Sequence, residues 1–310
     1  DCAELVRYCG WGGIPQVFDP MNDDFVDEYL ELKNLLNRDE YESARASTLT
    51  SHYTPRELIS LMWQMAIQCG FSGGAVGEFG AGIGHFIGLV PEKLAGKCQF
   101  TAVEIDSISA RILKMLYPRT KLHIGSLEKV SIRNNSLDLV IGNVPYGKQG
   151  VYDRLYPNYN LHNYFIARAL DALKPGGIAI LLTSNSTLDS LSAKARENFF
   201  SRAALLAAYR LPKDTFLANA GTEVVADLLV LQKEAKEIHP AMELMEVETA
   251  NNTGSMRINE YFVANPKNII GRLSNTGKMY GKPDCPTVLP NANTIDVLRQ
   301  RLSSIHVQEV

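Results

Sequence analysis

The 310-residue sequence lacks the marks of several large protein classes. No stretch approaches the ~18 consecutive apolar residues that a membrane-spanning helix requires, so we expect no membrane partner. The five cysteines are scattered and form no Cys-x-x-Cys pair, which argues against a disulfide framework and a structural zinc site. The charged start, Asp-Cys-Ala-Glu, lacks the apolar core of a signal peptide. Together these absences favour a cytoplasmic protein without a structural metal.

An excess of charge of either sign is also missing. The chain has 31 Lys and Arg against 34 Asp and Glu, which gives a net charge of −3. Proteins that bind nucleic acid non-specifically are usually basic, but a local cationic face is sufficient. The total therefore makes nucleic acid a less obvious partner without excluding it. An initiator Met is absent too, so we expect a trimmed chain or a piece of a longer polypeptide.

Short apolar runs alternate with helical patterns from residue 51 to residue 235. Runs of ~5–8 apolar residues between helices are typical of a mostly parallel sheet covered on both faces. We therefore predict an α/β fold with a Rossmann-like seven-stranded sheet over 51–235. Residues 1–50 form an N-terminal extension, partly helical, and 236–310 form a C-terminal extension that is a candidate for DNA or partner contact. The predicted strands are 75–79, 100–105, 121–124, 137–141, 178–183, 204–210 and 224–232.

Two boundaries are predicted from turn and cap residues. Thr54 can serve as the N-cap of a helix with Pro55 at its first position, and Gly70 can end that helix. Lys174-Pro175-Gly176-Gly177 is typical of a turn before the fifth strand.

Ligands of parallel sheets bind beyond the carboxyl ends of the strands, so the loops after strands are expected to carry the chemistry. The first such loop is Glu78-Phe79-Gly80-Ala81-Gly82-Ile83-Gly84, with Phe86 next. Glycines let the backbone approach a ligand closely and turn tightly into a helix. The spacing departs from Gly-x-Gly-x-x-Gly. From this loop alone, two other interpretations remain open: it could bind a nicotinamide cofactor, or it could be a structural turn without a ligand.

The second loop begins with Val103-Glu104-Ile105-Asp106 at the end of the next strand. An acidic residue there can accept both hydroxyls of an adenosine ribose. Glu104 lies ~25 residues beyond the glycine loop, which fits a βαβ unit. The two loops together predict an adenosine-containing cofactor, but they do not separate NAD from S-adenosylmethionine.

The fourth strand ends in Asn143-Val144-Pro145-Tyr146. An amide oxygen and the adjacent backbone carbonyl can both accept hydrogen bonds from one amino group, which orients the nitrogen lone pair toward a methyl sulfonium. Tyr146 supplies a planar surface on which a base can stack. A nicotinamide enzyme has no need for this arrangement, so the motif favours S-adenosylmethionine and an amino nitrogen as the methyl acceptor.

Here the chain resembles a known family. Asn143–Tyr146 is close to the (Asn/Asp/Ser)-Pro-Pro-(Tyr/Phe/Trp) motif of amino-methyltransferases. The motif order, with the cofactor loops before the catalytic one, is similar to the gamma class of N6-adenine DNA methyltransferases, over roughly residues 50–235. Tyr8–Phe18 resembles the segment that precedes the methylase in long methylase–helicase polypeptides of phages and mobile elements, and 220–227 and 261–266 also resemble that group, so the chain is similar to the methylase portion of such proteins. The chain has no Gly-x-x-x-x-Gly-Lys-(Ser/Thr) loop of a helicase motor.

The resemblance implies an S-adenosylmethionine-dependent methyltransferase fold and a role for each matched position. Catalysis would rest on Asn143, Val144, Pro145 and Tyr146. The cofactor would be held by Thr54, Glu78, Phe79, Gly80, Ala81, Gly82, Gly84, Phe86, Glu104, Ile105, Ser126, Leu127 and Asn143. The flipped base and its strand would contact Tyr146, Phe216 and Lys148. The implied partner is DNA, with a specificity or helicase partner or domain as a further candidate, as in restriction-modification systems.

Two residues depart from the family pattern. Val144 replaces the first proline of the motif, although valine supplies the same backbone carbonyl with less rigidity. Ser126 stands where an acidic residue is common, which predicts weaker cofactor binding. Residues 267–282 are cationic and can contact phosphates or form a solvated loop. Aromatic and basic residues in 148–162 suit a loop that clamps the substrate, and His162 within it is assigned no catalytic task.

Three hypotheses about the function remain open at this point. The leading one is methylation of adenine N6 in DNA by base flipping, because the amino group is inaccessible inside the stack. A second keeps the chemistry but places the acceptor amino group on an RNA base or a protein glutamine. A third is a methylase-like module that binds DNA or a protein partner without turnover.

Overall fold

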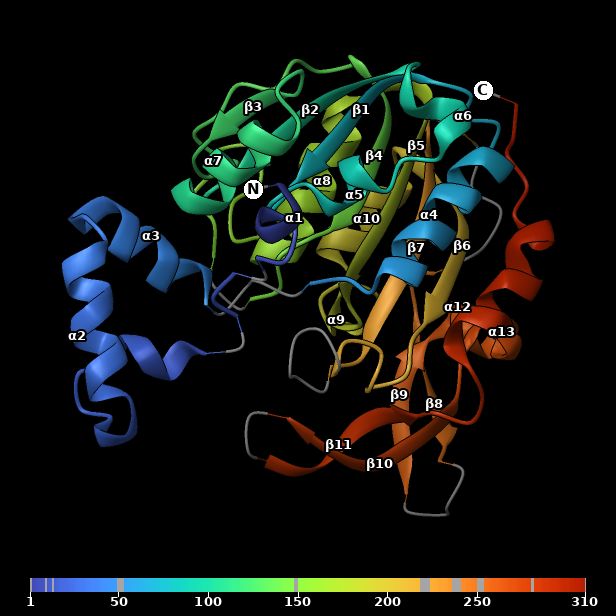
Figure 1. The fold of residues 1–310 in the computed structure, drawn as a ribbon. Helices are drawn as coiled ribbons and strands as arrows, with labels where there is room; N and C mark the ends of the chain where they lie inside the picture. Colours follow the sequence, from blue (N-terminus) through green and yellow to red (C-terminus); the bar gives the residue numbers. More distant parts are fainter. Residues whose placement is uncertain are drawn as a thin grey trace.

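The protein, seen in a computed structural model, is described over residues 2–8, 10–12, 14–48, 53–147, 150–217, 224–235, 241–249, 254–279 and 282–309. Within these residues the centre is a seven-stranded sheet in the order β3-β2-β1-β4-β5-β7-β6 (Figure 1). Strand β7 runs antiparallel to both of its neighbours, and the other neighbouring pairs are parallel. The predicted α/β fold with a mostly parallel sheet is therefore confirmed. The strands are β1 (Gly74–Phe79), β2 (Cys98–Glu104), β3 (Lys121–Ile124), β4 (Leu137–Asn143), β5 (Leu173–Ser184), β6 (Ala203–Arg210) and β7 (Ala226–Lys233).

The start of β5 differs from the sequence prediction. The sequence predicts a turn at Lys174–Gly177, but these residues belong to the strand. Leu137 of β4 pairs with Leu173, and the next recorded pair joins Leu139 to Ile178, so the residues between Leu173 and Ile178 bulge out of the ladder. The Pro-Gly-Gly sequence thus bends the strand without ending it.

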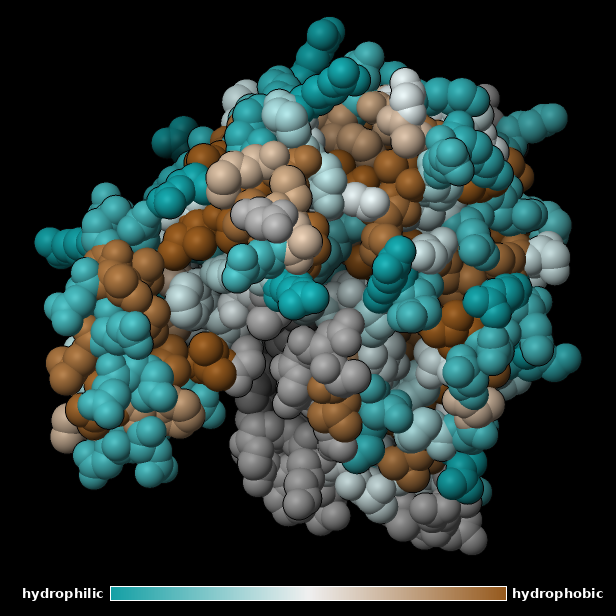
Figure 2. All heavy atoms as spheres, viewed as in Figure 1, coloured by the Kyte–Doolittle hydropathy of each residue, from teal (hydrophilic) through white to brown (hydrophobic). Residues whose placement is uncertain are grey.

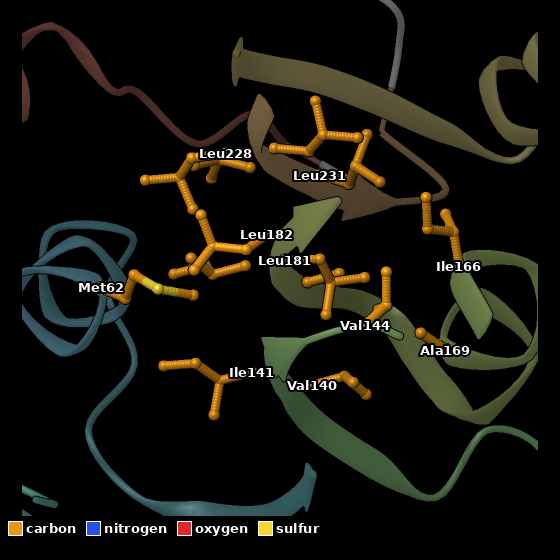
Figure 3. Packing of buried hydrophobic residues seen from close by; sticks show 14 of the residues in the cluster. Met62, Val140, Ile141, Val144, Ile166, Ala169, Leu181, Leu182, Leu228 and Leu231 are labelled. Carbon is orange, nitrogen blue, oxygen red and sulfur yellow. The ribbon is translucent and has the colours of Figure 1, made fainter. Parts of the chain in front are cut away.

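Helices cover both faces of the sheet. Those of the central body are α4 (Arg56–Gln68), α5 (His85–Gly88), α6 (Glu92–Ala95), α7 (Ser107–Leu116), α8 (Leu161–Ala172), α9 (Ser186–Asp189) and α10 (Lys194–Phe200). Figure 3 shows Met62 of α4 on one side of β4 and β5, and Ile166 and Ala169 of α8 on the other. Trp63 is fully buried, and its ring N–H donates to the Phe86 carbonyl at 3.0 Å. Among the described residues, no helix is both long and apolar enough to span a bilayer.

The start of α4 also differs from the prediction. Pro55, not Thr54, is the N-cap residue, and no side chain caps the helix there. The hydroxyl of Thr54 is instead an acceptor for Asn143, as described below. At the other end Gly70 has a φ of 83°, the left-handed conformation expected of a glycine that ends a helix.

The N-terminal residues form a helical arm beside the sheet (Figure 1). Its helices are η1 (Pro15–Phe18), η2 (Asp23–Phe25), α2 (Val26–Leu35) and α3 (Arg38–Ser47), whereas α1 (Cys2–Leu5) lies against the body beside α7. The arm has a small core of its own around Phe18 and Tyr41, and Figure 2 shows apolar and hydrophilic side chains mixed on its surface. An ion pair of Glu40 with Arg111 of α7 ties the arm to the body. Ser43 adds hydrogen bonds to the Ile105 carbonyl and to Asp106, at 3.3 and 3.2 Å.

The C-terminal residues are built into the body of the protein. They form two hairpins and short helices: β8 (Leu244–Glu248) with β9 (Ser255–Asn259), α12 (Glu260–Ala264), η3 (Pro266–Asn268), β10 (Arg272–Met279) with β11 (Lys282–Leu289), α13 (Thr294–Arg301) and η4 (Leu302–Ser304). Asn259 is fully buried, and its amide donates to the carbonyls of Leu188 and Ala241 at 3.1 and 2.8 Å. Farther along, Gln308 and Gln232 of β7 exchange hydrogen bonds of 2.8 and 2.9 Å.

A buried ionic cluster lies at the carboxyl end of β6. Arg210 is 2% exposed and donates from two nitrogens to Asp227, at 2.9 and 2.8 Å. A third nitrogen lies 2.6 Å from Asp189, and the guanidinium stacks 4.3 Å from the centre of the Phe262 ring. Since Asp227 is also fully buried, each charge in this cluster depends on the others for its stability.

We predict that Arg210→Ala lowers the free energy of unfolding by about 3–5 kcal/mol, because it leaves Asp227 buried and unpaired. Arg299→Ala is the matched control. It breaks the Arg299–Asp296 pair, whose side chains are 56% and 62% exposed, and is expected to change stability by less than about 0.5 kcal/mol. Urea denaturation of the three proteins measures both effects. Equal losses for the two substitutions would contradict this account of the cluster.

Candidate functional site

A cavity of about 280 Å³ opens at the carboxyl ends of β1, β2 and β4. This is the edge at which ligands of parallel sheets bind. Its wall is lined by Ala46, Ser47, Tyr53, Thr54, Ile59, Glu78, Gly80, Ala81, Gly82, His85, Phe86, Val103, Glu104, Ile105, Ser109, Gly125, Ser126, Leu127, Glu128, Asn143, Pro145, Val151, Leu161 and Phe165. Thus the glycine loop, the acidic strand end and the Asn-Val-Pro-Tyr motif, which lie far apart in the sequence, meet around one cavity.

The glycine loop is held in a conformation that favours glycine. Gly80, Gly82 and Gly84 have φ values of 78°, 54° and 85°. The backbone N–H groups of Gly80 and Ala81 both donate to the Val103 carbonyl of β2, at 2.8 and 3.0 Å. These bonds fix the loop against the neighbouring strand and leave its backbone as the floor of the cavity.

Glu104 lies at the end of β2 with its carboxylate already held. One oxygen accepts from the Gly82 N–H at 2.6 Å and the other from the Asp106 N–H at 2.7 Å. The residue is 7% exposed, and burial raises the pKa of its carboxyl to about 7, although those two hydrogen bonds oppose the shift. Glu104 therefore changes its charge near neutral pH.

Glu78 is a second buried carboxyl on the same wall, at 3% exposure. Burial and the nearby Glu104 raise its pKa well above the usual range, while the backbone N–H groups of Phe86 and Ile87 at the start of α5 act in the opposite direction. Its Oε2 atom has no hydrogen-bond partner among the described residues. Two adjacent buried carboxyl groups make this end of the cavity suited to a ligand that carries positive charge and hydrogen-bond donors.

Asn143 is the last residue of β4, and its side-chain amide is oriented from across the cavity. Its Nδ2 donates to the Thr54 hydroxyl at 3.2 Å, and Thr54 is itself 7% exposed. This bond joins residues that are 89 positions apart. Because the donor end of the amide points to Thr54, the acceptor end, Oδ1, faces the opposite side of the group.

The next two residues of the motif connect the strand to the cavity wall. Val144 continues the ladder, since its N–H donates to the Leu182 carbonyl of β5 at 3.0 Å, and its side chain is buried in the core (Figure 3). Pro145 lies beside the glycine loop: a Cβ added to Gly80 would meet the Pro145 ring at 3.4 Å and the Phe165 ring at 3.6 Å.

The residues assigned to the acceptor base lie elsewhere. Tyr146 and Phe216 are 8% and 0% exposed and are not part of the cavity wall. Burial raises the pKa of the Tyr146 hydroxyl, with a further contribution from Asp227. Phe79 is buried as well and lies outside the wall. Lys148 is outside the described residues.

Several residues of the cavity wall are not predicted by any pattern in the sequence. Ala46 and Ser47 come from the end of α3, so the arm covers part of the cavity. Tyr53 contributes an aromatic ring that packs edge-on against His85, and Phe165 contributes another from α8. The Tyr53-Thr54-Pro55 motif could have indicated Tyr53, but the others depend on how distant helices dock.

Comparison with known proteins agrees with this geometry. Residues 98–215 match the family described as Eco57I restriction-modification methylase. The defense against restriction protein B of Escherichia phage P1 is 32% identical over 215 residues. That match covers 67% of this chain but 9% of the phage protein, so the chain spans a small part of this relative.

Two solved structures share the fold at low sequence identity. The type I restriction-modification methyltransferase subunit from Streptococcus thermophilus is 12% identical with a TM-score of 0.55, over 90% of this chain and 61% of that one. The M protein of the type I restriction enzyme EcoKI is 12% identical with a TM-score of 0.53, over 93% and 77%. The family match and the fold together support S-adenosylmethionine as the cofactor. The chain therefore has the fold of S-adenosylmethionine-dependent methyltransferases and resembles the methylases of restriction-modification systems.

Proposed function

We propose that this chain is a DNA methyltransferase that transfers the methyl group of S-adenosylmethionine to the N6 amino group of a flipped adenine. The observation that carries the proposal is the position of Asn143. Its amide is oriented by Thr54 at the rim of the same cavity that holds Glu78 and Glu104. An amino group bound at Asn143 would thus lie next to the proposed cofactor site.

The residues of the cavity fit the proposed cofactor chemically. Glu104 would accept the ribose hydroxyls, as a strand-end carboxylate does in related folds. The Gly80–Gly84 backbone would pass along the methionine part through Gly80, Ala81 and Gly82, since Gly84 is not part of the wall, and Glu78 would lie near its positive charge. Ser126 and Leu127, after β3, are in the wall where the adenine would lie. When bound, S-adenosylmethionine supplies a methyl group on a sulfonium, an electrophile for nitrogen.

The chain's own groups would prepare the acceptor nitrogen. Asn143 Oδ1 and the Val144 carbonyl can accept the two hydrogens of one amino group. That arrangement draws the nitrogen out of conjugation with its ring and directs its lone pair toward the cavity. Methyl transfer would leave positive charge on this nitrogen, and the two oxygens would stabilise that charge until the proton is lost to water.

The charge distribution supports DNA as the acceptor. Residues 1–48 hold 11 acidic and 4 basic residues, so the remaining 262 residues hold 23 acidic and 27 basic ones. The net charge of −3 therefore combines an acidic arm with a basic remainder that can attract phosphates. Tyr146 and Phe216 would stack on the base, and Lys148 would contact its strand. Because both rings are buried, base binding has to be accompanied by a rearrangement that exposes them.

We predict that Asn143→Ala lowers methyl transfer to DNA by at least about 100-fold, because it removes an acceptor that faces the developing charge. Tritiated S-adenosylmethionine and unmethylated DNA measure the rate. Asn22→Ala, at the half-buried N-cap of η2 in the arm, is the matched control and should keep the full rate. Label that passes to RNA or to protein but not to DNA would overturn the choice of acceptor. Failure of S-adenosylmethionine to bind at millimolar concentration would overturn the proposal that this chain is a methyltransferase.

We predict that cofactor affinity rises with pH through neutrality. The Glu104 carboxyl has a raised pKa of about 7, so it is protonated below that pH and loses its charge as an acceptor for ribose hydroxyls. Affinity should be about tenfold lower at pH 6 than at pH 8. Calorimetric titration with S-adenosylmethionine checks this slope. Glu104→Gln should bind weakly and without that slope, and an unchanged slope in the variant would assign it to another group.

A further inference from the structure

A buried polar pair joins the start of α8 to the segment that follows β5. His162, in the first turn of α8, is 4% exposed, and its Nε2 is 3.1 Å from the Ser186 hydroxyl. The Ser186 hydroxyl is in turn 2.9 Å from that of Ser184, the last residue of β5. Since β4 lies between β1 and β5 in the sheet, the glycine loop and the Ser184–Ser186 turn flank Asn143 from opposite sides.

The register of the sheet places this turn beside the acceptor position. Asn143 is paired with Leu182, and the Val144 N–H donates to the Leu182 carbonyl. Ser184 therefore lies two residues beyond the level of Asn143, at the carboxyl edge, and the 184–186 turn is partly exposed. A planar ring whose amino group is held by Asn143 and the Val144 carbonyl would extend along the β5 flank of β4. The cofactor cavity occupies the other flank.

The surroundings of His162 indicate a role beyond filling space. Burial lowers the pKa of its imidazole to about 4, so the ring is neutral at pH 7 and offers one donor and one acceptor. Its Nδ1 atom and the Oδ1 atom of Asn163, which is 6% exposed, have no hydrogen-bond partner among the described residues. Buried polar atoms of this kind normally have partners, so two of them in one helical turn call for an explanation.

The same turn of α8 also borders the cofactor cavity. Leu161 and Phe165, one helical turn apart, are both part of its wall. The N-terminal part of α8 thus contacts the cavity through Leu161 and Phe165, and it contacts Ser186 at the start of α9 through His162. It is placed to set the distance between the two halves of the site.

We propose that His162 is a positioning residue for the methyl acceptor: through Ser186 it holds the Ser184–Ser186 turn as the acceptor-side wall, against which an amino-bearing nucleobase binds. This inference rests on the proposed function, because it assumes that Asn143 holds the amino group. His162 itself does not touch the reacting atoms.

The test compares five variants in methyl transfer from tritiated S-adenosylmethionine to unmethylated DNA. His162→Phe keeps the volume and removes both ring nitrogens, and Ser186→Ala removes the partner hydroxyl. Each should lower kcat/KM for DNA by about tenfold, since small displacements of a bound substrate cost that much or more. His162→Gln, which can still reach Ser186, should recover most of the loss. The affinity for S-adenosylmethionine should stay within about twofold of the original in all of them, because the cofactor side is unchanged.

Thr187→Val is the matched control. It removes the hydroxyl of Thr187 and so breaks the neighbouring buried hydrogen bond between Thr183 and Thr187, whose oxygens lie 2.8 Å apart. It should reduce thermal stability as His162→Phe does and leave kcat/KM for DNA unchanged. The double variant His162→Phe with Ser186→Ala should be no worse than either single one, because the two residues act as a unit.

The outcomes separate this inference from the function on which it rests. If the original protein transfers no methyl group to DNA, RNA or protein, the proposed function fails and this inference fails with it. If the original protein is active and His162→Phe keeps its kcat/KM within twofold, only the inference is overturned. A loss in Thr187→Val equal to that in His162→Phe would also overturn it, since both would then act through stability alone.

Discussion

The parallel pairing of β1 with β2 on one side and β4 on the other is the constraint on which the site depends. Glu78 pairs with Ala102 in β2, and Val76 pairs with Leu139 in β4, so the three strands end at one edge. The loops that follow these three strands therefore all line the same cavity. This convergence brings two buried carboxyl groups close enough for the charge of Glu104 to raise the pKa of Glu78. Shifting one strand by one residue would turn its last side chain to the other face of the sheet.

The sequence predicts those parts of the site that directly follow a recognisable strand. The glycine loop, the acidic strand end at Glu104 and the amide at Asn143 each follow an apolar run, and a strand end is a local signal. The contact between Thr54 and Asn143 spans 89 positions and depends on how α4 docks on the sheet. The part of the wall contributed by Ser47 depends in the same way on where the arm packs against α7. Docking of this kind leaves no periodic trace in a single sequence.

The cofactor side and the acceptor side of the proposed site differ in how accessible they are in this structure. The cofactor half is an open cavity whose loop is fixed by backbone hydrogen bonds to β2. The aromatic rings assigned to the acceptor, Tyr146 and Phe216, are buried in the core instead. Exposing them costs free energy that an acceptor has to offset, so acceptor binding is expected to be slower and more selective than cofactor binding. The pair of His162 and Ser186 lies at the boundary between these halves.

Val144 shows how the chain can depart from a motif and keep its geometry. A proline in this position would fix φ through its ring but would have no N–H. Valine has that N–H, and it donates to the Leu182 carbonyl at 3.0 Å, which extends the β4–β5 ladder past Asn143. The Val144 side chain is 3% exposed and packs in the core, so it is held from both sides. Sheet pairing and packing therefore restrict the backbone at Val144. In the Pro-Pro form of the motif, the proline ring restricts the backbone at this position.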